Sequence, residues 1–339
     1  MNEIIITDSS LRDGNHSVKH QISLKSIKKY CQFADKAKIP VIEVGHGNGL
    51  GASSVLIGEA LHTDKEILST ARKYLVNTKL GVHVIPGLAT INKDINQAID
   101  LGVDVFRVAS HCTEATVTKS HIEYLRKKNK IVYGVLMMTA LASVDELVEN
   151  AKIMQEYGAE ALIIMDSTGT YLPFDVGERI STLSDQLSIK IGFHAHNNLG
   201  MSIYNSIVAI QNGATHIDAC IRGFGAGAGN TPLEVLLPVM EKYNYQLDID
   251  FNLLIKEADK VMKYLIPSSP HISPVNVLTG LNRLFSGFEK PIIQASKINN
   301  LEYSSLIFEL GNRKLVAGQE DLILEIAQNL NSGKNNNFK

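Results

Sequence analysis

The sequence has little cysteine and almost no net charge, and each of these features argues against a class of protein. Its three cysteines, Cys31, Cys112 and Cys220, lie far apart and form no CxxC pair. This pattern argues against a disulfide framework or a cysteine-based zinc site and is typical of a reducing compartment. A formal net charge of −2 over 339 residues provides no basic surface for nucleic acid or for an anionic membrane.

Long apolar runs are also missing. No stretch reaches the ~18 residues that a membrane-spanning helix requires. The chain enters an apolar strand pattern at Ile4, which leaves no space for a signal peptide. The overall composition, 45% hydrophobic and 20% charged, is that of a globular protein. We therefore expect a cytoplasmic protein that has neither nucleic acid nor a membrane as its partner.

Short apolar runs alternate with helix-like segments along most of the chain. The predicted strands cover residues 4–7, 41–44, 80–85, 105–108, 131–136, 161–165, 189–193 and 216–219. The predicted helices cover residues 23–36, 64–74, 91–101, 118–128, 143–157, 175–184 and 201–212. This alternation predicts an α/β fold with a parallel sheet, and eight strands close a TIM (β/α)₈ barrel. A doubly wound open sheet is the alternative, but no glycine-rich nucleotide fingerprint follows the first strand.

We place the barrel at residues 1–265, because the texture of the sequence changes after Pro267. Ser268-Ser269-Pro270 and Ser273-Pro274 indicate a linker. Helices are then predicted at 275–285, 301–312 and 318–329. These segments predict a small helical C-terminal domain at 266–330, followed by a disordered tail at 331–339 that is rich in asparagine and lysine.

The first predicted strand runs into a loop that carries Arg12, Asp13, Gly14 and His16. Functional groups of a barrel enzyme gather where its strands end, so this loop is a candidate wall of an active site. The alternative is that Arg12 and Asp13 simply pair with each other. Other predicted strands also carry polar groups at or near their ends, namely Glu43, His46, His83, Arg107, Asp166, His194 and His196.

Strand seven ends in Gly192-Phe193-His194-Ala195-His196-Asn197-Asn198. In an extended segment residues two apart point to the same side, so His194 and His196 present two imidazoles together. With Asp13 they form a two-histidine, one-carboxylate set with open positions, which suits Mn²⁺, Mg²⁺, Fe²⁺, Co²⁺ or Zn²⁺. The alternative is a pair of hydrogen-bonded core histidines.

Leu11-Arg12-Asp13-Gly14 together with His194-Ala195-His196-Asn197-Asn198 resembles the superfamily of pyruvate aldolases, isopropylmalate synthases and hydroxymethylglutaryl-CoA lyases. Longer strings resemble the 4-hydroxy-2-oxovalerate aldolase family within it. They are Gly45-His46-Gly47-Asn48-Gly49-Leu50-Gly51, His111-Cys112-Thr113-Glu114-Ala115, Leu136-Met137-Met138, Gly225-Ala226-Gly227-Ala228-Gly229-Asn230 and Gly318-Gln319-Glu320-Asp321. The resemblance covers nearly the whole chain.

This resemblance implies a metal-dependent lyase that cleaves or forms a 4-hydroxy-2-oxo acid from the enolate of pyruvate and an aldehyde. Asp13, His194 and His196 would hold the metal, with Mn²⁺ the first choice and Mg²⁺, Co²⁺ or Zn²⁺ the alternatives. Arg12 would bind the enolate oxygen, and His16 would take the proton of the 4-hydroxyl. A cation and a guanidinium both stabilise an enolate, and histidine titrates near neutral pH. No predicted barrel strand ends in a lysine, which disfavours a Schiff-base aldolase.

Supporting roles follow from the same resemblance. Ser167 and Asn230 would hydrogen-bond the substrate or a metal-bound water, and Asp166 or Glu43 would orient the ligands; each has an equal structural alternative. The glycine-rich segment 223–230 does not fit a nucleotide fingerprint. The family also implies an acylating aldehyde dehydrogenase as a partner, and a homo-oligomer is a further expectation.

Two departures from the family pattern concern the aldehyde side. The family has a tyrosine near the start of the C-terminal domain that reaches the site. The apparent equivalent here is Asn282, a weaker candidate for substrate binding, whose amide can hydrogen-bond but cannot act as a phenolic acid. The family also has a histidine where Ala140 follows Met137-Met138-Thr139. We therefore expect a divergent aldolase whose acceptor differs from the small aldehydes of the family. The alternatives are a Claisen-type synthase that condenses an acyl-CoA with a 2-oxo acid, and a non-catalytic assembly subunit.

Overall fold

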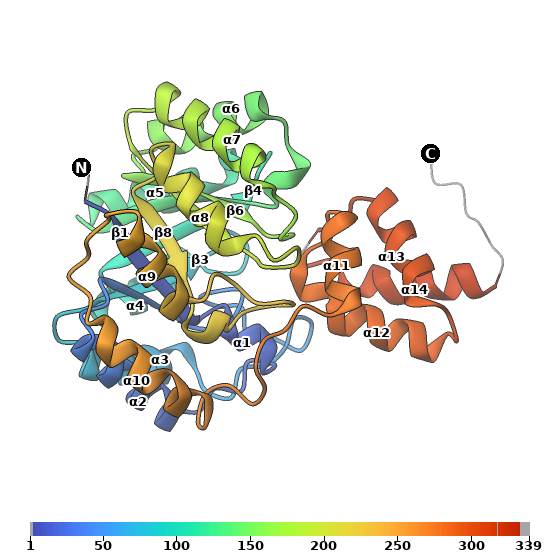
Figure 1. Ribbon diagram of the computed structural model, residues 1–339, viewed down its shortest axis with the longest axis horizontal. Coiled ribbons are helices and arrows are strands. Elements are labelled where there is room, and N and C mark those ends of the chain that lie inside the picture. Colours follow the sequence, from blue (N-terminus) through green and yellow to red (C-terminus); the bar gives the residue numbers. More distant parts are fainter. Residues whose placement is uncertain (1–2, 317, 333–339) are drawn as a thin grey trace.

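The computed structural model describes residues 3–316 and 318–332 (Figure 1). Eight strands form a closed parallel barrel in sequence order. They are β1 Ile5–Leu11, β2 Val41–Val44, β3 Lys79–Val84, β4 Val105–His111, β5 Ile131–Met137, β6 Ala161–Asp166, β7 Lys190–Ala195 and β8 His216–Ala219. Each predicted strand overlaps an observed one, and the pairing of β1 with both β2 and β8 closes the ring. The predicted TIM barrel is confirmed.

Helices surround the barrel and cover the outer faces of its strands (Figure 1). They are α2 Leu24–Lys36, α3 Asp64–Tyr74, α4 Asn96–Asp100, α5 Lys119–Lys127, α6 Val144–Glu156, α7 Pro173–Gln186, α8 Ser202–Gln211, α9 Leu233–Lys242 and α10 Phe251–Met262. The short helix α1 Gly14–Ser17 lies instead at the carboxyl end of β1 (Figure 1). Local sequence explains several starts: Thr63 with Glu66 and Ser143 with Glu146 form capping boxes before α3 and α6, which satisfy free N–H groups of the first turn.

Two helix predictions need correction. The segment predicted as one helix over 91–101 begins with a π-helical turn, Ile91–Ile95, before α4. Helices α9 and α10 were not predicted at all. Helix α9 follows Pro232 and contains Pro238, and proline is the residue that sequence patterns treat as a helix boundary.

The inside of the barrel changes character along its axis. An apolar cluster begins at the amino ends with Val41, Val105 and Ala161, the first residues of three strands, and extends along the barrel as far as Met165 of β6. Further along, Glu43, Arg107 and Asp218 are buried inside the barrel. The polar chemistry is therefore placed towards the carboxyl ends, where barrel enzymes carry their active sites.

A separate group of helices follows the barrel. It contains α11 Pro274–Leu281, α12 Glu289–Ile298, α13 Tyr303–Asn312 and α14 Glu320–Asn331. Three of these overlap predicted helices, and α12 was not predicted. The group has its own hydrophobic core, which begins at Val275, whereas Ile266 still packs into the core of the barrel. The domain limits at 265 and 266 stay predictions, and the predicted tail at 331–339 lies, beyond Ser332, outside the described residues.

The C-terminal helices lie beside the end of the barrel where the strands terminate (Figure 1). Hydrogen bonds join them to the loops after β6 and β7. The Ser286 N–H donates to Ser167 O at 3.0 Å, and its hydroxyl donates to Asn198 Oδ1 at 2.8 Å. The C-terminal helices therefore cover the region in which the candidate residues lie. No helix within the described part of the chain is long and apolar enough to span a membrane.

Candidate active site

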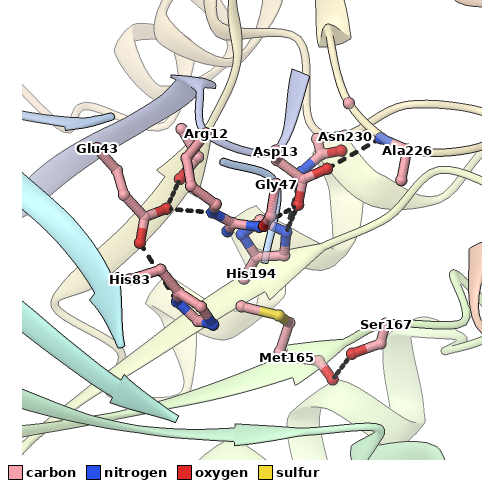
Figure 2. Close-up of polar contacts among 12 residues, drawn as sticks. Arg12, Asp13, Glu43, Gly47, His83, Met165, Ser167, His194, Ala226 and Asn230 are labelled. Atoms are coloured by element: carbon pink, nitrogen blue, oxygen red, sulfur yellow. Dashed lines mark hydrogen bonds and ion pairs between the residues drawn. The ribbon is translucent and has the colours of Figure 1, made fainter. Parts of the chain in front are cut away.

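Arg12 and Asp13 lie between the end of β1 and the start of α1, and both side chains are buried. Arg12 Nη1 is 2.8 Å from Asp13 Oδ2, so the two side chains do pair (Figure 2). The pair is not isolated, because Arg12 Nε also donates to Glu43 Oε2 at 2.8 Å. Arg12 Nη2 is buried and has no hydrogen-bond partner among the residues that the structure describes. One donor of the guanidinium is therefore free for a ligand.

Asp13, His194 and His196 come together although they are far apart in the sequence. One ligand atom from each lies within 4.8 Å of the others, and all three residues are buried. Asp13 Oδ2 is 3.6 Å from His194 Nε2 and 3.9 Å from His196 Nε2. Asp13 Oδ1 accepts a hydrogen bond from the Ala226 N–H at 2.9 Å (Figure 2). Oδ2 is thereby the carboxylate oxygen directed at the histidines.

The surroundings of His194 fix its tautomer. Its Nδ1 lies 2.9 Å from Asp218 Oδ2, which accepts the ring proton. Its Nε2 then carries the lone pair and accepts from the Asn230 amide at 2.9 Å. An imidazole whose Nδ1 proton is held by a carboxylate binds a cation through the lone pair of Nε2. One carboxylate and two imidazoles therefore fit a divalent metal.

Charge and burial oppose each other in this group. Burial favours the protonated form of Asp13, but Arg12 and the two histidines outweigh it and hold the pKa of the carboxyl well below its usual range. Burial lowers the pKa of His196 to about 3. For His194 burial also acts to lower the pKa, but the contacts with Asp13 and Asp218 outweigh it and raise the value.

His16 lies in α1, and its ring packs against the backbone of the loop after β2. A Cβ placed on Gly47 would lie 2.6 Å from ring atoms of His16, so position 47 has room only for glycine. Loss of water around the ring, opposed by Asp13 and aided by Arg12 and His46, lowers the pKa of His16 to about 4. His16 is therefore neutral at pH 7 and able to accept a proton.

A cavity of about 380 Å³ opens onto these groups. Arg12, Asp13, His16 and His196 line its polar part. The rest of its wall is largely apolar and includes Ile85, Val117, Met137, Met138 and Met165. A second cavity of about 540 Å³ lies next to it and shares Asn48, Ile57, His16 and Phe285 as lining residues. His16 and Phe285 thus stand between two open spaces.

The weaker candidates have separate positions. The Ser167 hydroxyl lines the smaller cavity and accepts from the Met138 N–H at 3.0 Å. Asn230 contacts the ligand set through His194. Asp166 accepts hydrogen bonds from Thr168 Oγ1 and from the N–H groups of Thr170 and Tyr171. Asp166 therefore holds the loop after β6, whereas Glu43 holds Arg12.

The choice of Asn282 as the C-terminal residue that reaches the site needs correction. Its amide donates to Leu278 O at 2.8 Å, within its own helix, and its Cβ lies against Gly311. Phe285, three residues later, lines the cavity, and its ring centroid is 6.1 Å from that of His16. The chain leaves the helix at Leu281, and Arg283 adopts a φ of 55°, so helical spacing does not continue to residue 285. A phenyl ring occupies this place.

Ala140 is also not at the site. It packs in the hydrophobic core around the barrel and is 6% exposed. Of the two segments that depart from the family pattern, only the C-terminal one therefore places a residue at the cavity. That residue is Phe285.

Sequence reasoning overlooked two further residues. Asp218 was not named, and Arg107 was noted on its strand without a role. Both are buried inside the barrel and contact each other. Each is a charged residue within a predicted strand. Arg107 lies in the strand pattern Val105–Val108, and Asp218 lies in His216–Ala219.

Comparison with known protein families places the two parts of the chain separately. Residues 3–261 match the HMGL-like family, and residues 270–332 match the DmpG-like communication domain. A 4-hydroxy-2-oxovalerate aldolase from Pectobacterium atrosepticum is 52% identical over 328 residues, which are 97% of this chain and 96% of that protein. One from Spirochaeta aurantia is 51% identical over 332 residues, 98% of this chain and 97% of that protein.

Solved structures are similar as well. The N-terminal domain of a candidate aldolase from Bacteroides vulgatus superposes with a TM-score of 0.74 at 25% identity, covering 88% of this chain and 100% of that one. The carboxyl transferase domain of Rhizobium etli pyruvate carboxylase gives a TM-score of 0.81 at 13% identity, covering 98% of this chain and 60% of that one. The second similarity concerns the fold alone.

Proposed function

The chain belongs to the family of the 4-hydroxy-2-oxovalerate aldolases, and we propose that it interconverts a 4-hydroxy-2-oxo acid with pyruvate and an aldehyde. The observation that carries this proposal is the convergence of a guanidinium, a neutral imidazole and a two-histidine, one-carboxylate set at the carboxyl ends of the barrel strands, where Arg12, His16, Asp13 and His196 line one cavity. These groups match the needs of carbon–carbon cleavage beside a ketone, in which negative charge develops on the keto oxygen.

Asp13, His194 and His196 would hold a divalent cation, with Mn²⁺ as the first candidate. The donor set alone leaves Mg²⁺, Co²⁺ and Zn²⁺ as alternatives. Bound there, the cation would polarise the keto group and stabilise the enolate charge. The charge of the surroundings supports this assignment. Asp13, Glu43 and Asp218 carry three negative charges and Arg12 and Arg107 two positive ones, which leaves one net negative charge beside the histidines.

Arg12 is placed to bind the oxygen that becomes the enolate. Two of its three nitrogens are engaged by Asp13 and Glu43, which orient the guanidinium plane. The third, Nη2, is buried and finds no partner within the described part of the chain, and Arg12 lines the cavity. A hydrogen bond to an ionised group is worth about 1.5–3 kcal/mol. This donor would gain that energy as charge develops on the substrate oxygen.

His16 would act as the base for cleavage. It takes the proton of the 4-hydroxyl, the C3–C4 bond breaks, the aldehyde carbonyl forms, and the electron pair of the broken bond becomes the enolate. Addition of a proton at C3 then gives pyruvate, so the products are pyruvate and one aldehyde. The lowered pKa of His16, about 4, keeps the ring neutral and ready to accept the proton at pH 7.

The aldehyde half would occupy the apolar part of the cavity. Phe285 borders this region and cannot donate a proton as a phenol would,. The proposal that the acceptor differs from short aldehydes therefore rests on residue 285. A kinetic panel that gave short aldehydes the highest kcat/KM would refute this part of the proposal.

The match of residues 270–332 to a DmpG-like communication domain supports interaction with a partner dehydrogenase. We propose an acylating aldehyde dehydrogenase, which would consume the aldehyde as it is released. A homo-oligomer is a further proposal. Sedimentation of the purified chain, alone and with such a dehydrogenase, tests both: a single-chain mass in both runs would refute them.

The function is tested by supplying 4-hydroxy-2-oxovalerate to the purified chain with Mn²⁺ and measuring pyruvate through lactate dehydrogenase. We expect pyruvate to form with the metal, and neither without it nor in H194A. Release of free thiol from acetyl-CoA and a 2-oxo acid, without pyruvate formation, would identify the Claisen-type synthase instead. Tight metal binding with neither reaction would identify an assembly subunit.

A further inference from the structure

A charged layer crosses the inside of the barrel behind the candidate site. Glu43 of β2, Arg107 of β4 and Asp218 of β8 form it, with exposed fractions of 0%, 0% and 2%. All three come from even-numbered strands, and alternate strands of a TIM barrel contribute to one interior layer. Such layers are usually filled by valine, isoleucine and leucine. Three charged side chains in this place call for an explanation.

Arg107 joins the two carboxylates. Its Nη2 bonds to Asp218 Oδ2, and its Nη1 lies 3.4 Å from Glu43 Oε2. Each carboxylate continues towards the site. Asp218 Oδ2 is 2.9 Å from His194 Nδ1, and Glu43 Oε2 is 2.8 Å from Arg12 Nε. Arg107 is therefore one residue removed from a candidate metal ligand on one side and from the candidate enolate-binding guanidinium on the other.

Asp13 closes this chain of contacts into a ring. Its Oδ2 is 2.8 Å from Arg12 Nη1 and 3.6 Å from His194 Nε2 (Figure 2). The ring runs through Arg12, Glu43, Arg107, Asp218, His194 and Asp13, and returns to Arg12. Basic and acidic groups alternate around it. A shift of any member would therefore be transmitted to both halves of the site.

We propose that Arg107 is a positioning residue that fixes His194 and Arg12 relative to each other. It is fully buried inside the barrel, and it acts on them through Asp218 and Glu43. This inference rests on the proposed function, in which the ligand set and Arg12 act on the same 2-oxo acid. A misplacement of about 1 Å between such groups costs about 100-fold in rate.

Stability alone does not explain the layer. Replacing a buried ion network by apolar side chains of similar volume is often neutral or stabilising. The choice of arginine is explained by geometry, because its planar fork reaches two carboxylates with separate nitrogens, whereas lysine offers one point charge. R107K therefore retains the charge but loses the bridge, and it distinguishes positioning from simple neutralisation.

The test compares wild type, R107K and the control R179M. Arg179 is a mostly buried arginine, 13% exposed at its side chain, which bonds to Asp175 O and packs on Tyr171. Mn²⁺ affinity is measured on metal-free protein by electron paramagnetic resonance, and pyruvate affinity by calorimetry with Mn²⁺ present. We expect R107K to lose about 10–100-fold in Mn²⁺ affinity, as for other residues that orient metal ligands. Pyruvate affinity should fall as well, and R179M should match wild type in both.

R107K with wild-type affinity for both Mn²⁺ and pyruvate would overturn the inference, and loss of one affinity alone would refute the coupling. Circular dichroism checks that R107K folds. If it does not, the R107M/D218N double variant, which removes one charge of each sign, is compared with D218N alone, and a loss of pyruvate affinity beyond that of D218N is expected. Wild type that binds no Mn²⁺ would refute the proposed function itself, which separates that failure from failure of the inference.

Discussion

Asp218 Oδ2 lies 2.9 Å from Nδ1 of His194 and thereby determines which nitrogen of that imidazole faces the site. With the proton on Nδ1, the lone pair of Nε2 accepts from the Asn230 amide, and Nε2 lies 3.6 Å from Asp13 Oδ2. The barrel thus orients a candidate metal ligand through a residue on the neighbouring strand β8.

Replacement of Asp218 by asparagine should therefore weaken metal binding. An asparagine can present its N–H₂ to Nδ1 and favour the wrong tautomer of His194. We expect D218N to bind Mn²⁺ about 10–100-fold more weakly, as measured by titration of the metal-free protein. The control is D248N, which removes an exposed carboxylate paired with Lys38 and should bind as wild type does. Equal affinity of D218N and wild type would contradict this account.

Gly47 should be required for the placement of His16. A methyl group at this position would lie 2.6 Å from the imidazole, and the ring would have to move away from the cavity. We expect G47A to lower kcat for cleavage at least 100-fold, the lower bound for loss of a positioned base, with Mn²⁺ affinity unchanged. G177A is the matched control, because its added methyl group meets nothing closer than 3.6 Å. If G47A cleaves substrate at the wild-type rate, His16 is not the base.

Residue 285 should determine how the aldehyde half reacts. F285Y adds a phenolic hydroxyl to the wall that already packs near His16, where the ring centroids are 6.1 Å apart. A proton donor placed beside the reacting oxygen accelerates cleavage, so we expect F285Y to raise kcat several-fold. F285L removes the ring without adding a donor and serves as the comparison. Equal rates for F285Y and F285L would show that the hydroxyl has no effect.

A buried histidine at the amino end of strand β8 should make the free energy of unfolding depend on pH. His216 begins β8, is 5% exposed, and packs edge-on against Tyr133. Burial lowers its pKa from 6.5 to about 4. The unfolded chain therefore binds more protons than the folded one between these values, and the contribution of His216 is complete above pH 6.5 and lost as the pH falls to 4,.

The size of this effect is about 3 kcal/mol, because one unit of pKa corresponds to about 1.4 kcal/mol. It is measured as the difference in free energy of unfolding between wild type and H216F in urea at several pH values. Taking the difference removes the contributions of the other buried histidines. A constant difference from pH 7 to pH 4 would refute the assignment.

The barrel and the grouping of the candidate ligands could be predicted from the sequence, and the reason is physical. Apolar strand patterns are local, and two histidines two apart on one strand face the same side wherever that strand lies. Asp13 could be assigned to the same ligand set because the carboxyl ends of all barrel strands lie at one end of the barrel.

Residues defined by contacts across the barrel could not be found in this way. Arg107 and Asp218 are 111 positions apart, and only the closed barrel brings them together. Phe285 was missed for a different reason. Its place depends on how the chain leaves α11 after Leu281, which the family resemblance that pointed to Asn282 does not describe.

The most direct measurement is exchange of the C3 protons of pyruvate into D₂O, followed by NMR on metal-free protein with and without added Mn²⁺. Formation of the pyruvate enolate requires this exchange and requires no aldehyde. We expect exchange with the wild-type protein and Mn²⁺, and none without the metal or in R12A, because Arg12 supplies the free donor of the site. Exchange that persists in R12A, or its absence when bound Mn²⁺ and pyruvate are both detected, would contradict the account.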